Sequence, residues 1–98
     1  MQVYQHLKIY KFILILMKTK IIQALADPTR FKIIERISAG EVCACEFTKH
    51  VDVSQPAVSQ HLKVLLDAGL VMVRKDGTKR VYSLSPLGKK VMRDISRW

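Results

Sequence analysis

Apolar positions recur at helical spacing along most of the chain and alternate in only one segment, which predicts a mainly α-helical fold with one β-hairpin. Near the N-terminal end, apolar residues separated by steps of four and three form a stripe, flanked by Ile13 and Leu16: Val3, Leu7, Tyr10, Leu14, Met17 and Ile21. This spacing predicts one long amphipathic helix over residues 1–25. Because a small domain has little use for so much apolar surface at one end, we expect the stripe to pack against a second subunit, with core packing as the alternative.

Residues suited to capping the start of a helix predict two further helices. Asp27 can cap a helix whose first turn contains Pro28 and which ends at residues 38–40. Its apolar residues, which should be largely buried, are Phe31, Ile33, Ile34 and Ile37. Ser85 and Pro86 start a last helix over residues 85–98, with the apolar stripe Leu87, Val91, Ile95 and Trp98. We expect the first and last helices to form a homodimer interface around a two-fold axis.

The segment between residues 41 and 68 predicts a helix-turn-helix. Its first helix runs from about Glu41 to His50 and carries Val42, Cys43 and Phe47. Its second helix starts at Ser54, a good N-cap, with Pro56 in the first turn, and ends at Gly69, which can adopt a positive φ. The positions of this second helix that should be buried are Val58, Leu62, Leu65 and Leu66.

Residues 70–84 predict a hairpin. Two strand-like segments, residues 71–75 and 79–84, flank Asp76-Gly77, a dipeptide suited to a tight turn. A helix-turn-helix followed by a hairpin is the order of elements in a winged helix-turn-helix. We therefore expect residues 1–98 to form a single winged helix-turn-helix DNA-binding domain.

The outer face of the second helix carries side chains suited to reading DNA. Amides can pair with adenine edges, hydroxyls with bases or phosphates, and lysine with phosphate. Cations on the hairpin can contact neighbouring phosphates, although such cations also protect exposed strand edges in many proteins. The predicted DNA-binding residues are Ser54, Gln55, Pro56, Ser59, Gln60, His61 and Lys63 on the helix, and Arg74, Lys75, Lys79 and Arg80 on the hairpin.

The charge of the chain points to a polyanionic partner. Lysine and arginine number 17 against eight acidic residues, a formal net charge of +9. Double-stranded DNA and an anionic membrane surface both fit, so a basic membrane-surface or adaptor module is the alternative class. The apolar run at residues 12–17 is too short for a signal core or a membrane span, which argues against membrane insertion. No nucleophile with a base, phosphate loop or carboxylate pair indicates an enzyme.

Cys43 and Cys45 are the only cysteines, which fits a reducing cytoplasm. On a regular helix their side chains would point about 200° apart, so one ion could contact both only if the helix distorted, and that distortion would move the reading helix. Thiolates prefer soft ions such as trivalent arsenic, Cd, Hg, Cu(I) or Zn. A redox switch and simple packing are alternatives, and this spacing disfavours an internal disulfide relative to one between subunits.

Residues 21–84 resemble the ArsR/SmtB family of metal-responsive winged-helix repressors. The resemblance lies in residues 24–30 (ALADPTR), 41–46 (EVCACE), 54–62 (SQPAVSQHL) and the hairpin. It implies a homodimer that binds an inverted repeat in its own promoter and dissociates when an inducer binds. It also implies that Cys43 and Cys45 are inducer ligands, most typically for arsenite or antimonite, with no obligatory cofactor. In that family a third cysteine often stands at the position that Thr48 occupies here. Three alternatives therefore stay open: a two-thiolate sensor, a redox regulator and an inducer-free regulator.

Overall fold

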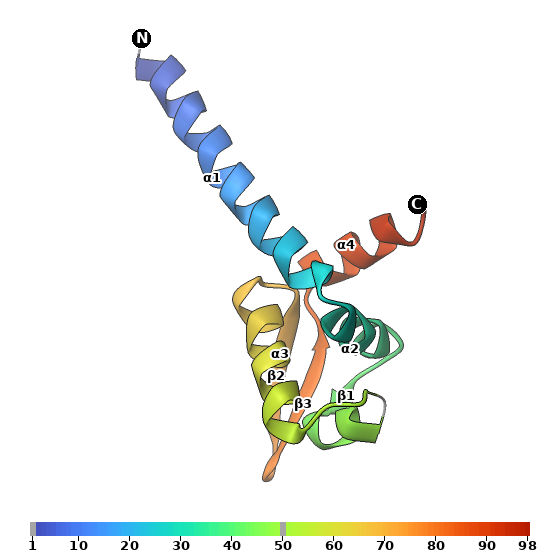
Figure 1. Cartoon of the computed structure of the whole chain (residues 1–98). Helices are drawn as coiled ribbons and strands as arrows, with labels where there is room; N and C mark the ends of the chain where they lie inside the picture. The colour runs from blue at the N-terminus through green and yellow to red at the C-terminus, as the bar shows by residue number, and fades with distance from the viewer. Residues whose placement is uncertain (1, 50) are drawn as a thin grey trace.

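A computed structural model describes residues 2–49 and 51–98, with side chains described from residue 8 onward. Figure 1 shows a long N-terminal helix that projects from a body of shorter helices packed against strands. The elements, in chain order, are α1 (Gln2–Ala26), α2 (Pro28–Ser38), β1 (Val42–Cys43), the 3-10 helix η1 (Ala44–Lys49), α3 (Gln55–Asp67), β2 (Val71–Asp76), β3 (Lys79–Leu84) and α4 (Pro86–Ile95).

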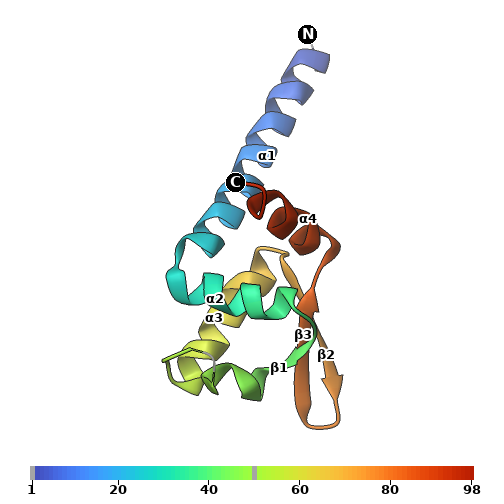
Figure 2. The ribbon, with the colours of Figure 1, turned by 90° about the vertical axis from the view of Figure 1, so that its right-hand side faces the viewer.

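The core lies between α2, α3, η1 and the sheet. In Figure 2, α2 and α3 lie on one side of the core and the three strands on the other. The largest side chains that are almost completely buried there are Phe47, Ile33, Ile34, Ile37, Leu62, Leu65, Leu70 and Val58. The helices of this body therefore turn their apolar stripes inward, and the predicted winged helix-turn-helix is confirmed.

The predicted starts of three helices are confirmed by their caps. The side chains of Asp27, Ser54 and Ser85 each accept a hydrogen bond from a backbone N–H of the following turn, at 2.8, 3.4 and 2.9 Å. Each cap satisfies a donor that has no partner within its helix. After α3 the chain turns at Gly69, whose φ of +77° is the left-handed conformation expected there.

The hairpin belongs to a three-stranded antiparallel sheet in the order β1-β3-β2. Asp76 pairs with Lys79, so the residues at the centre of the turn are Gly77 and Thr78 and not Asp76-Gly77 as predicted. Gly77 alone supplies the positive φ, +63°. The turn therefore lies one residue further along, and Asp76 is the last residue of β2.

The helix predicted from Glu41 to residue 50 is wrong. Val42 and Cys43 pair with Tyr82 and Val81 of β3, and a 3-10 helix follows, with residue 50 itself outside the described residues. Val42 is β-branched and pairs with a distant strand. This pairing stabilises a strand more than the local sequence pattern stabilises a helix. Phe47, which the sequence pattern placed on an apolar face, is nevertheless fully buried.

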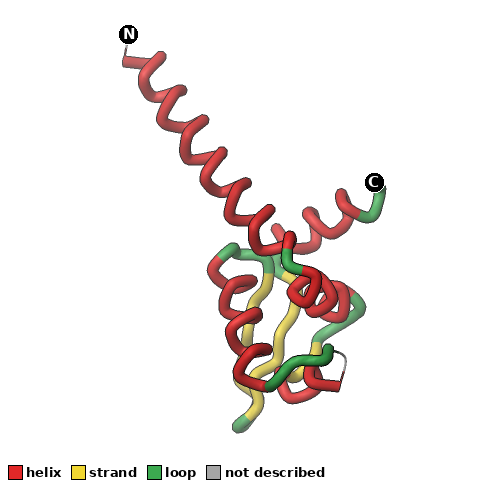
Figure 3. Tube along the Cα trace, in the orientation of Figure 1, coloured by secondary structure: helices red, strands yellow, loops and turns green. Residues whose placement is uncertain are grey.

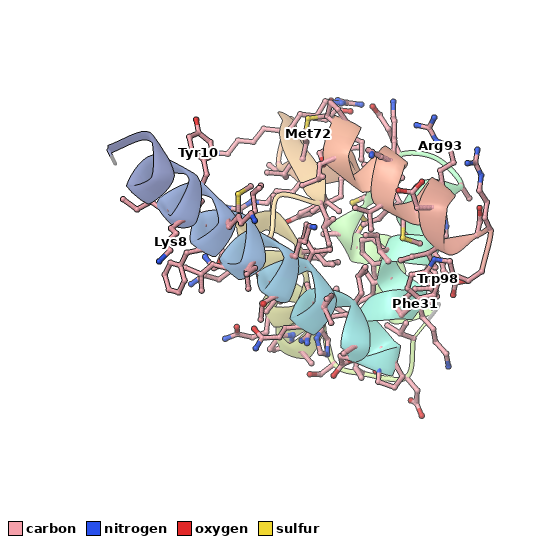
Figure 4. All side chains as sticks on the ribbon, turned by 90° about the horizontal axis from the view of Figure 1, so that it is seen from above. Lys8, Tyr10, Phe31, Met72, Arg93 and Trp98 are labelled. Carbon is pink, nitrogen blue, oxygen red and sulfur yellow. A yellow bond between two sulfur atoms is a disulfide. The ribbon has the colours of Figure 1, made fainter. Side chains whose placement is uncertain are left out.

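Two predicted apolar stripes differ in their surroundings. Every described side chain of α1 from residue 8 to residue 20 is exposed, and Figure 3 shows this helix extending away from the body. The side chains of Val3 and Leu7, at the start of that stripe, lie outside the described residues. The predicted helix over 85–98 ends at Ile95, so Trp98 is not part of its stripe and is 94% exposed (Figure 4). Within the described residues, no helix is long and apolar enough to cross a membrane.

Candidate nucleic-acid interface and cysteine pair

Helix α3 has one buried face and one exposed polar face. Val58, Leu62 and Leu65 point into the core, and Leu66 is half-buried. Of the predicted DNA-binding residues on this helix, the exposed ones are Gln55, Pro56, Ser59, Gln60 and Lys63, with Ser54 exposed at its cap. The helix thus presents amides, hydroxyls and a cation together, which is a combination of groups that contacts base edges and phosphates.

His61 lies apart from this exposed face. It is half-buried, and its Nδ1 lies 3.3 Å from Nη1 of Arg30, at the start of α2. Because a guanidinium only donates hydrogen bonds, Nδ1 is the acceptor in this contact. Arg30 also donates to the Gln23 and Ala24 carbonyls at the end of α1, at 3.2 and 2.8 Å. His61 therefore contacts the group that fixes α1, a role that the sequence pattern did not reveal.

The cations of the hairpin differ in their partners. Arg74 donates from Nη2 to Oε2 of Glu41 at 2.8 Å, and its Nη1 lies 4.0 Å from Oδ2 of Asp76. Lys75, Lys79 and Arg80 are exposed, and none of the three forms an ion pair with another described residue. The positive charge available to an external phosphate is therefore concentrated at the end of the hairpin.

The two cysteines lie side by side, which corrects the prediction that their side chains diverge. Cys43 ends β1, Cys45 lies in the first turn of η1, and the two form a disulfide with their Cα atoms 5.3 Å apart. The expectation that this spacing disfavours an internal disulfide is also wrong. The physical reason is the strand at Val42 and Cys43, because the angular separation of a regular α-helix does not apply there.

The cysteine pair lines the same groove as α3 and the hairpin. This open groove, of about 520 Å³, has among its lining residues Cys43, Cys45, Gln55, Ser59, Lys79 and Arg80. Gln55 donates from Nε2 to the Ala44 carbonyl at 3.5 Å, a long hydrogen bond between the reading helix and the segment that carries the cysteines. Sequence reasoning did not foresee this proximity, because it depends on the pairing of β1 with β3.

The donors at the cysteine pair suit a soft ion bound by two sulfurs. Among residues 2–49 and 51–98, no group of three or more histidine, cysteine, aspartate or glutamate side chains is placed to hold a metal. The neighbouring carboxylates are engaged elsewhere, Glu41 with Arg74 and Glu46 with Arg36 at 3.7 Å. Reduction of the disulfide would yield two adjacent thiolates, which are ligands that a thiophilic ion prefers.

Comparisons with known proteins identify the family. The model of the bacterial regulatory protein arsR family matches residues 27–73. The HTH-type transcriptional regulator Rv2034 of Mycobacterium tuberculosis is 51% identical over 77 residues, which cover 78% of this chain and 72% of that protein. The arsenical resistance operon repressor of Staphylococcus xylosus is 45% identical over 65 residues, 66% of this chain and 62% of that one.

Solved structures agree on the fold. HlyU from Vibrio cholerae N16961 is 29% identical, with a TM-score of 0.75 over 84% of this chain and 90% of that one. NolR from Sinorhizobium fredii is 28% identical, with a TM-score of 0.78 over 90% and 89% of the two chains. The chain therefore belongs to the bacterial regulatory protein arsR family and is a DNA-binding transcriptional regulator with a winged helix-turn-helix fold.

Proposed function

We propose that this protein is a repressor that binds an inverted-repeat operator as a homodimer and is released when Cys43 and Cys45 bind trivalent arsenic or another soft ion. One observation carries the proposal: the exposed polar face of α3 and the cations of the hairpin border a single groove that contains both cysteines. A reducing cytoplasm, where DNA is present and thiols are kept reduced, is the compartment that fits.

Specific contacts are assigned to the exposed face of α3. Gln55, Ser59 and Gln60 read base edges in the major groove, while Lys63 contacts phosphate. Ser54 and Pro56, at the start of the helix, lie beside the DNA backbone. His61 is expected to act indirectly, since its contact with Arg30 keeps it off this face. Lys75, Lys79 and Arg80 hold the flanking phosphates, and Arg74 does so only if it leaves Glu41.

A homodimer is supported by the exposed surface of α1. Large apolar side chains on this helix are about half-exposed or more, among them Tyr10, Leu14 and Met17. A helix that is apolar and uncovered in one subunit is expected to be buried in an assembly. The solved winged helix-turn-helix domain of Mb0332 from Mycobacterium bovis, which is 22% identical and has a TM-score of 0.81, is described as homodimeric. A two-fold axis would place two reading helices on an inverted repeat.

Support for a metalloid inducer comes from the cysteine pair and from relatives. The arsenical resistance operon repressors of Staphylococcus xylosus and Escherichia coli are 45% and 40% identical over 65 and 72 residues. A redox-responsive regulator is the second candidate, and the disulfide between Cys43 and Cys45 is the observation that favours it. Peroxide would then replace the metalloid as the signal.

The DNA-binding part of the proposal is tested by selecting duplexes from a random library with the purified protein. We expect enrichment of an inverted repeat, and loss of its preference over random competitor in the double variant Gln55→Ala, Ser59→Ala. The matched control is Gln23→Ala, an exposed amide on α1. Binding that is equal for every polyanion would contradict the proposal and favour a general basic module.

The sensing part is tested on the selected duplex with the reduced protein. Arsenite, Cd²⁺, Zn²⁺ and peroxide are titrated separately while fluorescence anisotropy reports release. The double variant Cys43→Ser, Cys45→Ser should bind DNA normally and resist release. Release by arsenite alone supports the metalloid sensor and release by peroxide alone supports the redox regulator, whereas unchanged release of the variant rejects both.

A further inference from the structure

The cysteine pair lies within the surface that is proposed to face DNA, and not behind it. Cys43 is paired with Val81, the residue next to Arg80 of the hairpin. Cys45 is exposed, and the groove that it lines is bordered by Gln55 and Ser59 of α3 on one side and by Lys79 and Arg80 on the other. The groove between α3 and the hairpin therefore contains the sulfur-bearing side chain of Cys45.

The segment that holds the cysteines is fixed at both ends. Val42 and Phe47 on either side are 2% and 0% exposed. Glu41 is paired with Arg74 of β2, and Glu46 with Arg36 of α2. A chain anchored by two buried side chains is poorly suited to pass a large movement to α3, because buried side chains can shift only if the core around them repacks.

We propose, on the basis of the function proposed above, that Cys45 is part of the DNA-contact surface and that a group bound to its sulfur and the operator exclude each other by occupying the same space. Release then requires neither distortion of the helix-turn-helix nor a bridge between the two sulfurs. A single group of sufficient size on Cys45 is enough, and its charge near Lys79 and Arg80 adds to the effect when it is anionic.

Protection of the thiol by DNA tests this proposal. Iodoacetamide forms an S–C bond with the cysteine and releases iodide, while the thiol proton goes to the buffer, so its rate reports access to sulfur. Three single-thiol proteins are compared, each with and without saturating operator: Cys43→Ser, which retains Cys45, and two variants that add Gln60→Cys or Glu35→Cys to the background Cys43→Ser, Cys45→Ser. Position 60 lies on the proposed DNA-reading face, whereas Glu35 is an exposed residue of α2 that lies outside the groove and outside the helices expected to pair subunits.

We expect DNA to slow alkylation at least tenfold at Cys45 and at position 60, and not at position 35. Protection at position 60 without protection of Cys45 would overturn this inference and leave the proposed function intact. If neither position is protected although the duplex binds, the assignment of the DNA-facing surface fails, and the inference fails with it.

Adduct size gives a second readout that a transmitted distortion would not produce. In the Cys43→Ser variant no bridge between two sulfurs can form within one subunit. We expect a methylthio group on Cys45, added by a thiosulfonate that releases a sulfinate, to weaken operator binding less than the larger N-ethylmaleimide adduct, which should weaken it at least tenfold. The same adducts at position 35 should have no effect. Undiminished binding by the larger adduct on Cys45 would overturn the proposal.

Discussion

Arg74 and Glu41 form an ion pair, with Nη2 of Arg74 donating to Oε2 of Glu41 at 2.8 Å, that joins the hairpin to the segment carrying the cysteines. The hydrogen bond and negative charge of Glu41 raise the pKa of Arg74 above its usual range. Both side chains are about half-exposed, so solvent screens the pair and its contribution to folding is small. Its main consequence is that one hairpin cation is neutralised within the subunit.

The first prediction concerns that neutralisation. The substitution Glu41→Gln releases Arg74 and adds one cation to the DNA-facing surface. If Arg74 then contacts a phosphate, the slope of log affinity against log salt concentration becomes steeper by about 0.9, with no change in the preferred sequence. Operator binding measured by anisotropy over a series of salt concentrations gives the slope.

Glu46→Gln is the matched control, because it releases Arg36 of α2 and not a hairpin residue. We expect its salt slope to remain close to that of the wild type. An unchanged slope in Glu41→Gln as well would mean that Arg74 does not gain a phosphate contact when it is freed.

The second prediction concerns the junction between the hairpin and α4. Ser85 is buried, donates to the Gly69 carbonyl at 2.6 Å and accepts from the Gly88 N–H at 2.9 Å. Ser85→Ala removes an N-cap and leaves buried groups without partners, so the free energy of unfolding should fall by about 1–2 kcal/mol. Urea denaturation followed by circular dichroism measures this loss. Ser96→Ala, at an exposed position, should change it by less than about 0.5 kcal/mol.

The parts of the fold that could be predicted are those specified by neighbouring residues. Asp27, Ser54 and Ser85 start helices through hydrogen bonds to the next turn, and Gly69 ends one through its backbone conformation. Each of these signals acts over a few residues, so the sequence alone is sufficient to read it. The strand at Val42 was missed, because its partner Tyr82 lies far along the chain and no local pattern identifies it.

The candidate site was predictable in its chemistry but not in its geometry. The exposed amides and hydroxyls of α3 and the cations of the hairpin follow from helical and strand periodicity. The joining of Cys43 and Cys45, and the contact of His61 with Arg30, depend on tertiary structure. Residue type therefore indicated which groups make up the candidate site, while the fold determined which of them meet.

The third prediction concerns acid. Backbone hydrogen bonds, led by that from the Arg30 N–H, together with the Arg30 charge hold the pKa of Asp27 below its ordinary value of 3.8. A carboxyl with a lowered pKa in the folded state stabilises the fold at pH values above its unfolded pKa, and this contribution is lost as the pH falls through the folded-state pKa. We therefore expect wild type to exceed Asp27→Asn in thermal stability at pH 6, and the difference to shrink as the pH falls below about 4.

Asparagine still caps a helix, so the variant isolates the charge from the hydrogen bond. Melting temperatures by circular dichroism at pH 6, 4 and 2.5 give the difference at each pH. Asp52→Asn, an exposed position, is the control, and its difference from wild type should stay small throughout. A gap for Asp27→Asn that stays constant down to pH 2.5 would contradict the role given to the charge.

The last prediction tests whether α1 pairs subunits through one face. Leu14 lies on the predicted stripe, whereas Ile15 is turned by about 100° from it, and the two are similarly exposed, at 49% and 60%. In a dimer with a two-fold axis, each interface residue is buried once in each subunit. Each buried apolar side chain contributes about 1.5–3 kcal/mol to the free energy of association. Leu14→Asp should therefore raise the dimer dissociation constant by at least about 100-fold in sedimentation equilibrium, while Ile15→Asp changes it much less. Equal dissociation by the two variants would mean that α1 is buried on more than one side, as in a bundle of several helices, and not along a single stripe.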